Sequence, residues 1–276
     1  MKYVNTKPLA ILLAAYNCEK FLAEQLDSVL SQTNQEWTLY IRNDGSTDHT
    51  ADIIKQYAAK YNCIQPIDVG GGNLGCRGNF FRLLEVVESQ YYMFCDADDV
   101  WNPDMIELCL TTLRNNEKEN RPILVHSNYT VVDRNLSVKI PDMWKYLKLH
   151  PEKYYNYNLI AIANPIAGNI MFNHILKNYL FPLANNTLLH DRWIPMVAAR
   201  HNAIFKPVYT PTKKYRQHSD NYYGVRETQG KNVIQKLCNV YKANKFVADK
   251  LVQAGYGSYA KYIWYKLIYI IKRNLF

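Results

Sequence analysis

The sequence lacks three features that would assign it to other classes of protein. None of its six cysteines falls in a C-x-x-C pair, so the pattern indicates reduced thiols rather than a disulfide framework or a thiolate metal site. No window reaches about 18 uninterrupted apolar residues, so no membrane-spanning helix is predicted. The N-terminal stretch lacks the length and the cleavage site of a signal peptide. We therefore expect a cytoplasmic protein.

A surplus of charge is absent from most of the chain. The 276 residues carry a formal net charge of +9. Residues 231–276 hold nine Lys or Arg and a single acid, Asp249, which amounts to +8. The remainder is close to neutral, which argues against a general nucleic-acid-binding protein. The basic C-terminal segment instead fits an anionic surface as its partner.

What is present in the first hundred residues is an alternation of strand and helix patterns. With 48% hydrophobic and 21% charged residues, the chain suits one α/β domain with an appendage, or two small domains. Short apolar runs predict strands, and apolar residues at helical spacing predict helices. The strands are 9–16, 37–41 and 91–95, and the helices are 19–32, 46–61 (with Ser, Thr and Asp available as caps) and 78–89. This order predicts a parallel sheet with helices on both faces.

Beyond Trp101 the alternation is looser. We expect Pro195 to lie in the first turn of its helix, where proline is tolerated. The expected elements are a helix at 102–116, a strand at 122–133, a loop or short helices at 144–158, a strand leading into a helix at 166–176, a helix at 188–201, a strand followed by a polar loop at 203–224, and an amphipathic C-terminal segment. We divide the chain into a main domain, 1–228, with two parts at about 1–100 and 101–228, and a basic helical segment, 229–276.

Polar clusters follow three of the predicted strands. "YNCE" comes after the first strand, "NDGSTD" after the second and "DADD" after the strand at 91–95. Sheets of this kind bind ligands beyond the carboxyl ends of their strands. The coincidence of polar clusters with strand ends therefore predicts a ligand site at this edge.

Three carboxylates in "DADD", Asp96, Asp98 and Asp99, lie within four positions. Such a cluster can hold a hard divalent cation through oxygen ligands. The plainer alternative is that Asp99 caps the helix that starts near Pro103 and that the other two acids are solvated loop residues. The preceding buried strand favours a site, because it fixes the backbone that orients the acids.

Three further groups have both a functional and a structural interpretation. Asp44 before Gly45 suits a strand-to-helix turn, or an acceptor for a pyrimidine imide with Tyr16 stacking nearby. Asp191 at a helix start suits a dipole partner or cap, or a general base for a hydroxyl nucleophile. His218 in a polar loop suits a solvated histidine, or a neutral imidazole that completes a metal shell.

The motifs, taken in their order along the chain, resemble those of a known protein family. "LLAAYNCEKFLAEQLDSVLSQT", "RNDGSTDHT", "NLGCRGNFF", "MFCDADDVW", "HDRW" and "YRQHSDNYYG" together resemble the family 2 glycosyltransferases of the GT-A fold. Among these the chain looks most like bacterial rhamnosyltransferase-type enzymes that build cell-surface polysaccharides. The resemblance covers about residues 9–224, and it implies a Rossmann-like mixed sheet flanked by helices. It further implies that 1–228 is the catalytic domain, with a nucleotide-sugar-binding part at about 1–100 and an acceptor-binding part at 101–228.

The resemblance also implies roles for individual residues. The nucleotide-sugar-binding positions that it implies are Ala14, Tyr16, Glu19, Asp44, Arg77 near the donor phosphates, and Asp96 at the ribose or a metal-bound water. Asp98 would bind Mn²⁺ or Mg²⁺, with Asp96 and His218 as further metal residues, and Asp191 would be the catalytic base. Asn43 departs from the family pattern, in which many relatives have a second Asp before the position of Asp44.

The implied reaction is an inverting, metal-dependent transfer of a hexose, rhamnosyl, galactosyl or glucosyl. The donor would be a UDP- or dTDP-linked sugar, and the acceptor a glycan or a polyprenyl-diphosphate-linked oligosaccharide. A sugar-1-phosphate nucleotidyltransferase is disfavoured, because "AAYNCEK" has no glycine after the first strand. A non-catalytic sugar-binding protein is disfavoured, because the acids and His218 are present.

The C-terminal stretch 262–276 mixes Trp, Tyr, Ile and Leu with Lys266, Lys272 and Arg273. It would either pack on the catalytic domain, with its lysines toward water, or lie as an interfacial helix on anionic lipid at the inner face of the cell membrane. In the second case, deletion of 231–276 would release the protein from membranes. Loss of folding on deletion would favour packing.

Overall fold

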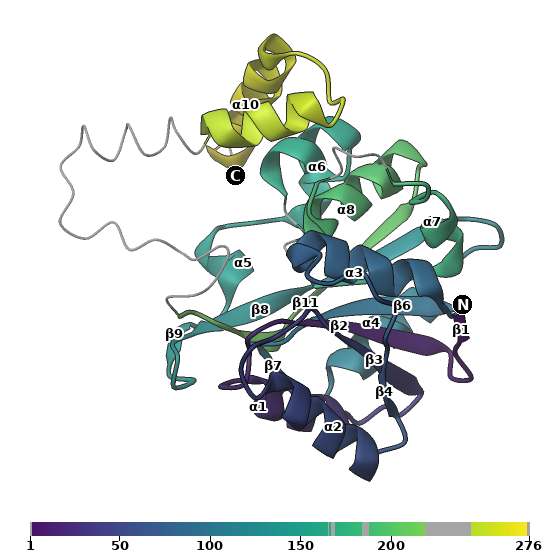
Figure 1. Ribbon diagram of the computed structural model, residues 1–276. Coiled ribbons are helices and arrows are strands. Elements are labelled where there is room, and N and C mark those ends of the chain that lie inside the picture. The colour runs from purple at the N-terminus through teal and green to yellow at the C-terminus, as the bar shows by residue number, and fades with distance from the viewer. Residues whose placement is uncertain (1, 165, 167–168, 184–187, 219–243, 275–276) are drawn as a thin grey trace.

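The computed structural model describes residues 2–164, 166, 169–183, 188–218 and 244–274 (Figure 1). In this part of the chain a nine-stranded sheet has the order β4-β3-β2-β6-β10-β8-β11-β7, with β9 paired to β8. Its strands are β2 (Leu9–Ala15), β3 (Trp37–Asn43), β4 (Ile64–Pro66), β6 (Tyr91–Asp96), β7 (Val100–Trp101), β8 (Ile123–Val132), β9 (Val138–Ile140), β10 (Ile170–Asn173) and β11 (Ile204–Arg216). A separate two-stranded sheet joins β1 (Tyr3–Val4) to β5 (Val87–Glu88).

The sheet is parallel in its N-terminal half and mixed beyond it. Strand β2 pairs in parallel with β3 and β6, and β3 pairs in parallel with β4. Strand β10 is antiparallel to both β6 and β8, while β11 is parallel to β8 and antiparallel to β7. The parallel arrangement expected from the strand–helix alternation is confirmed for the first hundred residues, and the whole sheet is mixed, as the resemblance implied.

Alternating side chains of the central strands enter two hydrophobic cores, one on each face of the sheet. Along β2, Leu9, Ile11 and Leu13 belong to one core, whereas Ala10 and Leu12 belong to the other. Both sets are fully buried, as the continuous apolar pattern of the strand requires. The position of each polar group at the strand end is therefore fixed by packing on both sides.

Helices cover both faces of the sheet (Figure 1). The core of Leu9 and Ile11 is covered by α1 (Leu22–Leu30), α2 (Thr50–Lys60) and α4 (Met105–Arg114). The opposite core is covered by α3 (Gly75–Val86), α6 (Tyr157–Ala163), α7 (His174–Asn178) and α8 (His190–Arg200). Short helices α5 (Met143–Tyr146) and η1 (Pro151–Tyr154) fill the stretch expected to be a loop or short helices.

Two expectations about helix starts are wrong. Pro195 is the sixth residue of α8 and so lies beyond its first turn. Because proline has no backbone N–H, the carbonyl of Asp191, four residues earlier, lacks its usual helical partner. Helix α2 begins only at Thr50, and the Asp48 carboxylate accepts the Thr50 N–H at 3.0 Å.

The C-terminal helix α10 (Tyr259–Asn274) packs against α6 on the side of the molecule far from α1 and α2 (Figure 1). Tyr262 is buried there, and the Tyr269 ring lies 5.4 Å from that of Tyr154. The expected domain boundary at 228/229 lies outside the described residues. Within the described ranges, no helix combines the length and the apolar character needed to cross a bilayer.

Candidate active site

The ends of three neighbouring strands bring the first candidate residues into one row. In the strand register, Ala14 of β2 pairs with Arg42 of β3 on one side and with Asp96 of β6 on the other. Residues paired in register share a face of the sheet. The small side chain of Ala14 therefore lies between the larger side chains of Arg42 and Asp96 on one face of the sheet.

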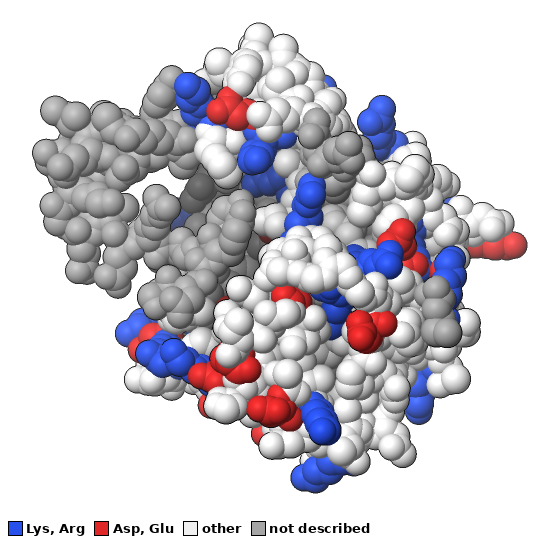
Figure 2. Space-filling model, viewed as in Figure 1, with Lys and Arg blue, Asp and Glu red and all other residues white. Residues whose placement is uncertain are grey.

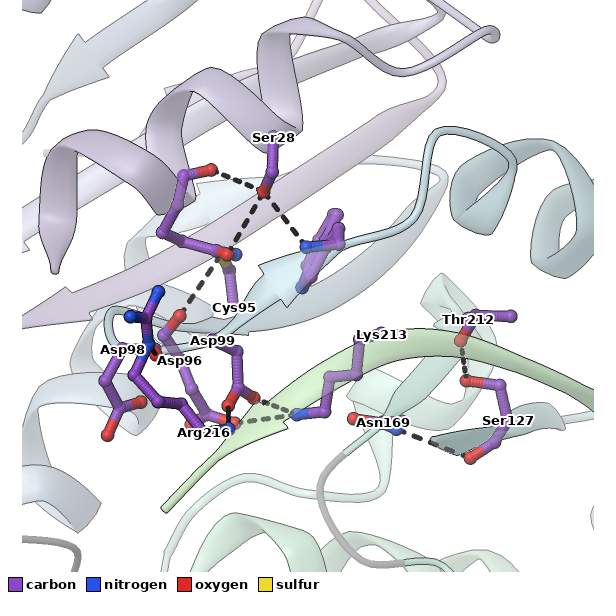
Figure 3. A network of polar contacts seen from close by, with 12 residues as sticks. Ser28, Cys95, Asp96, Asp98, Asp99, Ser127, Asn169, Thr212, Lys213 and Arg216 are labelled. Atoms are coloured by element: carbon purple, nitrogen blue, oxygen red, sulfur yellow. Dashed lines mark hydrogen bonds and ion pairs between the residues drawn. The ribbon is translucent and has the colours of Figure 1, made fainter. Parts of the chain in front are cut away.

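The acidic motif is neutralised by a lysine from a strand more than a hundred residues away (Figure 3). The Lys213 ammonium on β11 forms ion pairs with Asp96 Oδ2, at 3.2 Å, and with Asp99 Oδ2. Asp99 is fully buried, and its other oxygen accepts the Arg216 backbone N–H at 3.1 Å. Asp99 thus does not cap α4, whose N-cap residue is Asp104.

Lys213 is held in its charged form. Burial alone would lower the pKa of Lys213, but the adjacent Asp99 and Asp96 carboxylates outweigh it and raise that pKa well above its usual value. The strand end therefore carries a fixed positive charge between two acids, and this charge offsets the repulsion between their carboxylates.

The third acid, Asp98, points to a different partner. Its Oδ2 lies 3.0 Å from His218 Nε2, so the structure brings these two sequence-predicted metal residues together. The His218 ring stacks on Phe21, with centroids 4.6 Å apart. Arg216 also lies over Phe21 and pairs with Glu24, and it donates from Nε to the Asp98 carbonyl at 3.0 Å. Helix α1 and strand β11 thus hold the Asp98 loop between them.

A second ion pair fixes the turn after β3. Arg42 and Asp44 are both almost fully buried and form a salt bridge. Arg42 also donates to the carbonyls of Gly70 and Gly72, each at 2.8 Å. Asp44 Oδ1 accepts the Leu74 N–H at 2.8 Å. The pair therefore ties the glycine-rich loop between β4 and α3 to the end of β3.

Asp44 is the residue predicted to bind the nucleotide base, and in the structure its Oδ1 already accepts hydrogen bonds from Arg42 and from the Leu74 N–H. Tyr16, at the end of β2, is half exposed. The Glu19 carboxylate accepts the His49 backbone N–H at 2.9 Å and so links the first strand end to the start of α2. The roles of these three residues in nucleotide binding stay predictions.

Cys76 lies in the first turn of α3 and is solvent-exposed. Burial among protein atoms raises the pKa of this thiol to about 12, and the negative charges of Asp96, Asp191, Asp98 and Asp44 add to the shift. The candidate base, the acidic motif and the base-site acid are therefore all close enough to Cys76 for their charges to affect it, although they lie far apart in the sequence.

Asp191 is partly exposed in the first turn of α8. The preceding His190 is buried against Phe80 and Phe94, with ring centroids 4.2 and 4.8 Å away. Burial lowers the pKa of His190, while Asp191 and Asp96 oppose that shift. Packing of His190 thus fixes the start of the helix whose first turn carries Asp191.

Arg77 faces another part of the surface. It is exposed on α3 and lines a hollow of about 860 Å³. Lys177, Phe181 and Arg82 contribute to the same lining. Its expected contact with donor phosphates stays a prediction.

Sequence reasoning missed Lys213, Arg216 and Arg42. Arg42 stands directly before the Asp-Gly turn, and its proximity to Asp44 was the only available signal. Lys213 and Arg216 belong to a basic run that also fits a solvated strand edge. Their partners lie in a segment far away in the chain, so spacing alone gave no indication of the contact.

The residues present fit a divalent cation that is shared with a ligand. Among the described residues, no three His, Cys, Asp or Glu side chains form a group that could hold a metal by itself. Mg²⁺, however, commonly uses one or two carboxylates and completes its shell with phosphate oxygens and water. Asp98 would supply such a carboxylate and the neighbouring His218 a ring nitrogen as a further ligand, whereas Asp96 is paired with Lys213.

Comparison with known sequences identifies the family. Residues 10–180 match the glycosyl transferase family 2. The dTDP-rhamnosyl transferase RfbG of Shigella flexneri is 26% identical over 272 residues, which cover 89% of this chain and 90% of that protein. An uncharacterized glycosyltransferase of Haemophilus influenzae is 26% identical over 78% of this chain and 60% of its own length.

Solved structures agree in fold. The S. aureus TarS fragment 1–349 in complex with UDP-GlcNAc is 17% identical, with a TM-score of 0.60, over 91% of this chain and 67% of the fragment. A Pyrobaculum calidifontis mannosyltransferase in complex with GDP-Man and Mn²⁺ is 14% identical, with a TM-score of 0.54, over 98% of this chain and 87% of that one. With more than half of its length matched to the family, the chain belongs to glycosyl transferase family 2 and is a glycosyltransferase.

Proposed function

We propose that this enzyme transfers a hexosyl group, rhamnosyl, galactosyl or glucosyl, from a UDP- or dTDP-linked donor to a glycan or lipid-linked acceptor, with inversion. The pathway would be the synthesis of a bacterial cell-surface polysaccharide, at the cytoplasmic face of the membrane. The observation that carries the proposal is the contact of Asp98 with His218 beside the cluster of Lys213, Asp96 and Asp99 at the strand ends. The similarity to a dTDP-rhamnosyl transferase over 90% of that protein supports it.

The chain supplies a fixed electrostatic frame for the donor. Asp98 and His218 would hold Mn²⁺ or Mg²⁺, which when bound stabilises the charge of a departing diphosphate. Lys213 fixes Asp96 and Asp99, so these acids keep one orientation while a ligand enters and leaves. Arg42 fixes Asp44 together with the glycine-rich loop where the nucleotide base would lie.

Asp191 would act as the general base. In a single in-line displacement, the acceptor oxygen forms its bond to the anomeric carbon while the bond to the diphosphate oxygen breaks. The diphosphate leaves with the bonding electron pair, and Asp191 accepts the proton of the acceptor hydroxyl. One displacement inverts the anomeric centre, by analogy with single-displacement glycosidases.

A panel of UDP- and dTDP-sugars, assayed for hydrolysis and for transfer with and without EDTA, tests this function. We expect one donor class to be used in a divalent-dependent reaction. Asp191→Asn should lower transfer by roughly 10²–10⁴-fold without weakening nucleotide binding in calorimetry. The exposed Asp52 on α2 offers a matched control, since Asp52→Asn should leave transfer unchanged.

Three outcomes would contradict the proposal. If Asp98→Ala were folded and fully active, metal binding by the acidic motif would be excluded. Retention of anomeric configuration in the product would exclude a single displacement. Unchanged transfer by Asp191→Asn would exclude this residue as the base.

A further inference from the structure

Helix α10 carries a continuous row of exposed apolar side chains, here called the apolar stripe. Its members are Ile263, Trp264, Leu267, Ile270 and Ile271, with exposed fractions between 44% and 62%. Their spacing along the chain, i, i+1, i+4, i+7 and i+8, places all five on one side of a helix. A water-soluble surface rarely gathers so many large apolar groups unless they bind something.

The apolar stripe is exposed although α10 itself is packed on the protein. The other side of α10 is packed on the protein, with Tyr262 buried and Tyr265 and Tyr269 partly buried against the core. Tyr262 also donates from its hydroxyl to Asn244 Oδ1 at 3.2 Å. One face of α10 thus holds the helix on the domain, and the apolar stripe is left outward.

The charges near the apolar stripe are mainly positive. Helix α10 contains no acidic residue, and by helical spacing Lys261, Lys266 and Lys272 lie on its flanks outside the stripe. The preceding segment adds exposed Lys245 and Lys250, and its one acid, Asp249, accepts a hydrogen bond from the Tyr259 hydroxyl. Figure 2 shows the upper end of the molecule, where these helices lie, as a mostly uncharged surface with basic side chains and an acidic group near its edges.

We propose that the apolar stripe of α10 inserts into the interface of an anionic lipid bilayer, with the helix axis parallel to the membrane plane. An amphipathic helix with apolar residues on one side and lysines beside them binds such an interface through both burial and charge. A neutral protein partner would not require the lysines, and an acidic one would not require so wide an apolar face. The idea deepens the proposed function, because a lipid-linked acceptor is anchored in the same surface.

Trp264 provides a direct readout. It is 62% exposed, whereas Trp37, Trp101 and Trp144 are buried. Vesicles of phosphatidylcholine mixed with phosphatidylglycerol should shift the tryptophan emission of the full chain to shorter wavelength, and vesicles of phosphatidylcholine alone should do so much less. Trp264→Phe should keep vesicle binding in flotation and lose most of the shift.

The combined variant Ile263→Ser, Leu267→Ser and Ile270→Ser tests the stripe itself. It should lower binding to the anionic vesicles by roughly tenfold or more and should leave donor hydrolysis in solution unchanged. Val138→Ser is the matched control, since Val138 is 58% exposed on β9, away from α10. It should bind vesicles as the unsubstituted protein does.

Unchanged flotation of the stripe variant would overturn the proposal. The proposal would also be overturned if the unsubstituted protein did not float with anionic vesicles and formed a dimer that the stripe variant does not form. The stripe would then be the contact with a second copy of the chain. Failure of the proposed function is distinguishable, because donor hydrolysis would then be absent in every variant while vesicle binding persisted.

Discussion

Lys213 is the residue on which the acidic motif depends. Asp99 is fully buried, and Lys213 is its only cationic side-chain partner among the described residues. Lys213→Met would leave that carboxylate without a counter-charge, and removing one member of a buried pair costs about 3–5 kcal/mol. We expect the free energy of unfolding in urea to fall by that amount.

The neighbouring Lys214 offers a control on the same strand, because no ion pair of its side chain is present among the described contacts. Lys214→Met should change stability by less than about 0.5 kcal/mol. Adding Asp99→Asn to Lys213→Met should recover part of the loss. If the two lysine substitutions lowered the free energy of unfolding equally, the buried pair of Lys213 and Asp99 would not contribute more to stability than an exposed lysine does.

His126 on β8 gives the protein a pH dependence of known sign. Burial lowers the pKa of His126 from its usual value to about 3, and its Nε2 lies 2.6 Å from the Tyr155 hydroxyl. Above pH 6.5 the ring is neutral in both the folded and the unfolded chain. Between pH 6.5 and 3 only the unfolded chain takes up the proton, so stability is lost as pH falls through this window.

We expect this single histidine to contribute a slope that approaches about 1.4 kcal/mol per pH unit. Urea unfolding at pH 7, 6 and 5 should show a smaller loss for His126→Gln than for the unsubstituted protein. An identical slope in both proteins would mean that His126 is protonated in the folded state. His190 is buried as well and should add to the background slope in the same direction.

At the scale of elements, the glycine-rich loop between β4 and α3 is held chiefly by one side chain. Arg42 bonds to two of its carbonyls and to Asn79 Oδ1 on α3, at 3.2 Å. Arg42→Met removes these bonds and leaves Asp44 buried without its cation. We expect faster hydrogen exchange of the amides in 68–75, and weaker binding of the nucleoside diphosphate at an almost unchanged kcat.

Arg82 is the control for that prediction. It donates to Val69 O at 3.3 Å but is well exposed and pairs with Glu85 at the surface. Arg82→Met should therefore change exchange in the same loop only slightly. If Arg42→Met and Arg82→Met gave the same exchange rates, Arg42 would not be the residue that fixes the loop.

The hydrophobic pattern predicted the strands and helices well, but it did not predict which side chains contact each other between them. Strands β2 and β6 are buried on both faces, so their apolar runs identified them with little ambiguity. Strand β11 is different, because Pro207 and Pro211 interrupt it and register shifts surround Pro211. Whether Lys213 or Lys214 points inward depends on that register, and two adjacent lysines carry no signal that distinguishes them.

The sequence predicted the acids of the candidate site but not the basic side chains that pair with them. Asp96, Asp98 and Asp191 could be named from their motifs, and the charges of all three affect the thiol of Cys76 in the structure. Their cationic partners come from tertiary pairing across more than a hundred residues. Such pairing follows from the strand order of the sheet, which local sequence does not encode.

At the scale of the whole molecule, the C-terminal helices are part of the folded core. Leu251, Tyr256 and Tyr262 are at most 5% exposed, and burying each large apolar side chain contributes about 1.5–3 kcal/mol. Deletion of 231–276 should therefore lower the melting temperature markedly or make the protein insoluble. A truncated chain with an unchanged melting temperature would contradict this.

The position of β11 near the end of the catalytic fold has a consequence for biosynthesis. The acids of the "DADD" motif leave the ribosome long before Lys213 and Arg216 do. Until those residues emerge, the nascent chain has no described cation to place against Asp99, and burying that carboxylate uncompensated is costly. The strand-end loop at 96–99 should thus acquire its final packing only after β11 has been translated, even if the parallel sheet of the first hundred residues forms earlier.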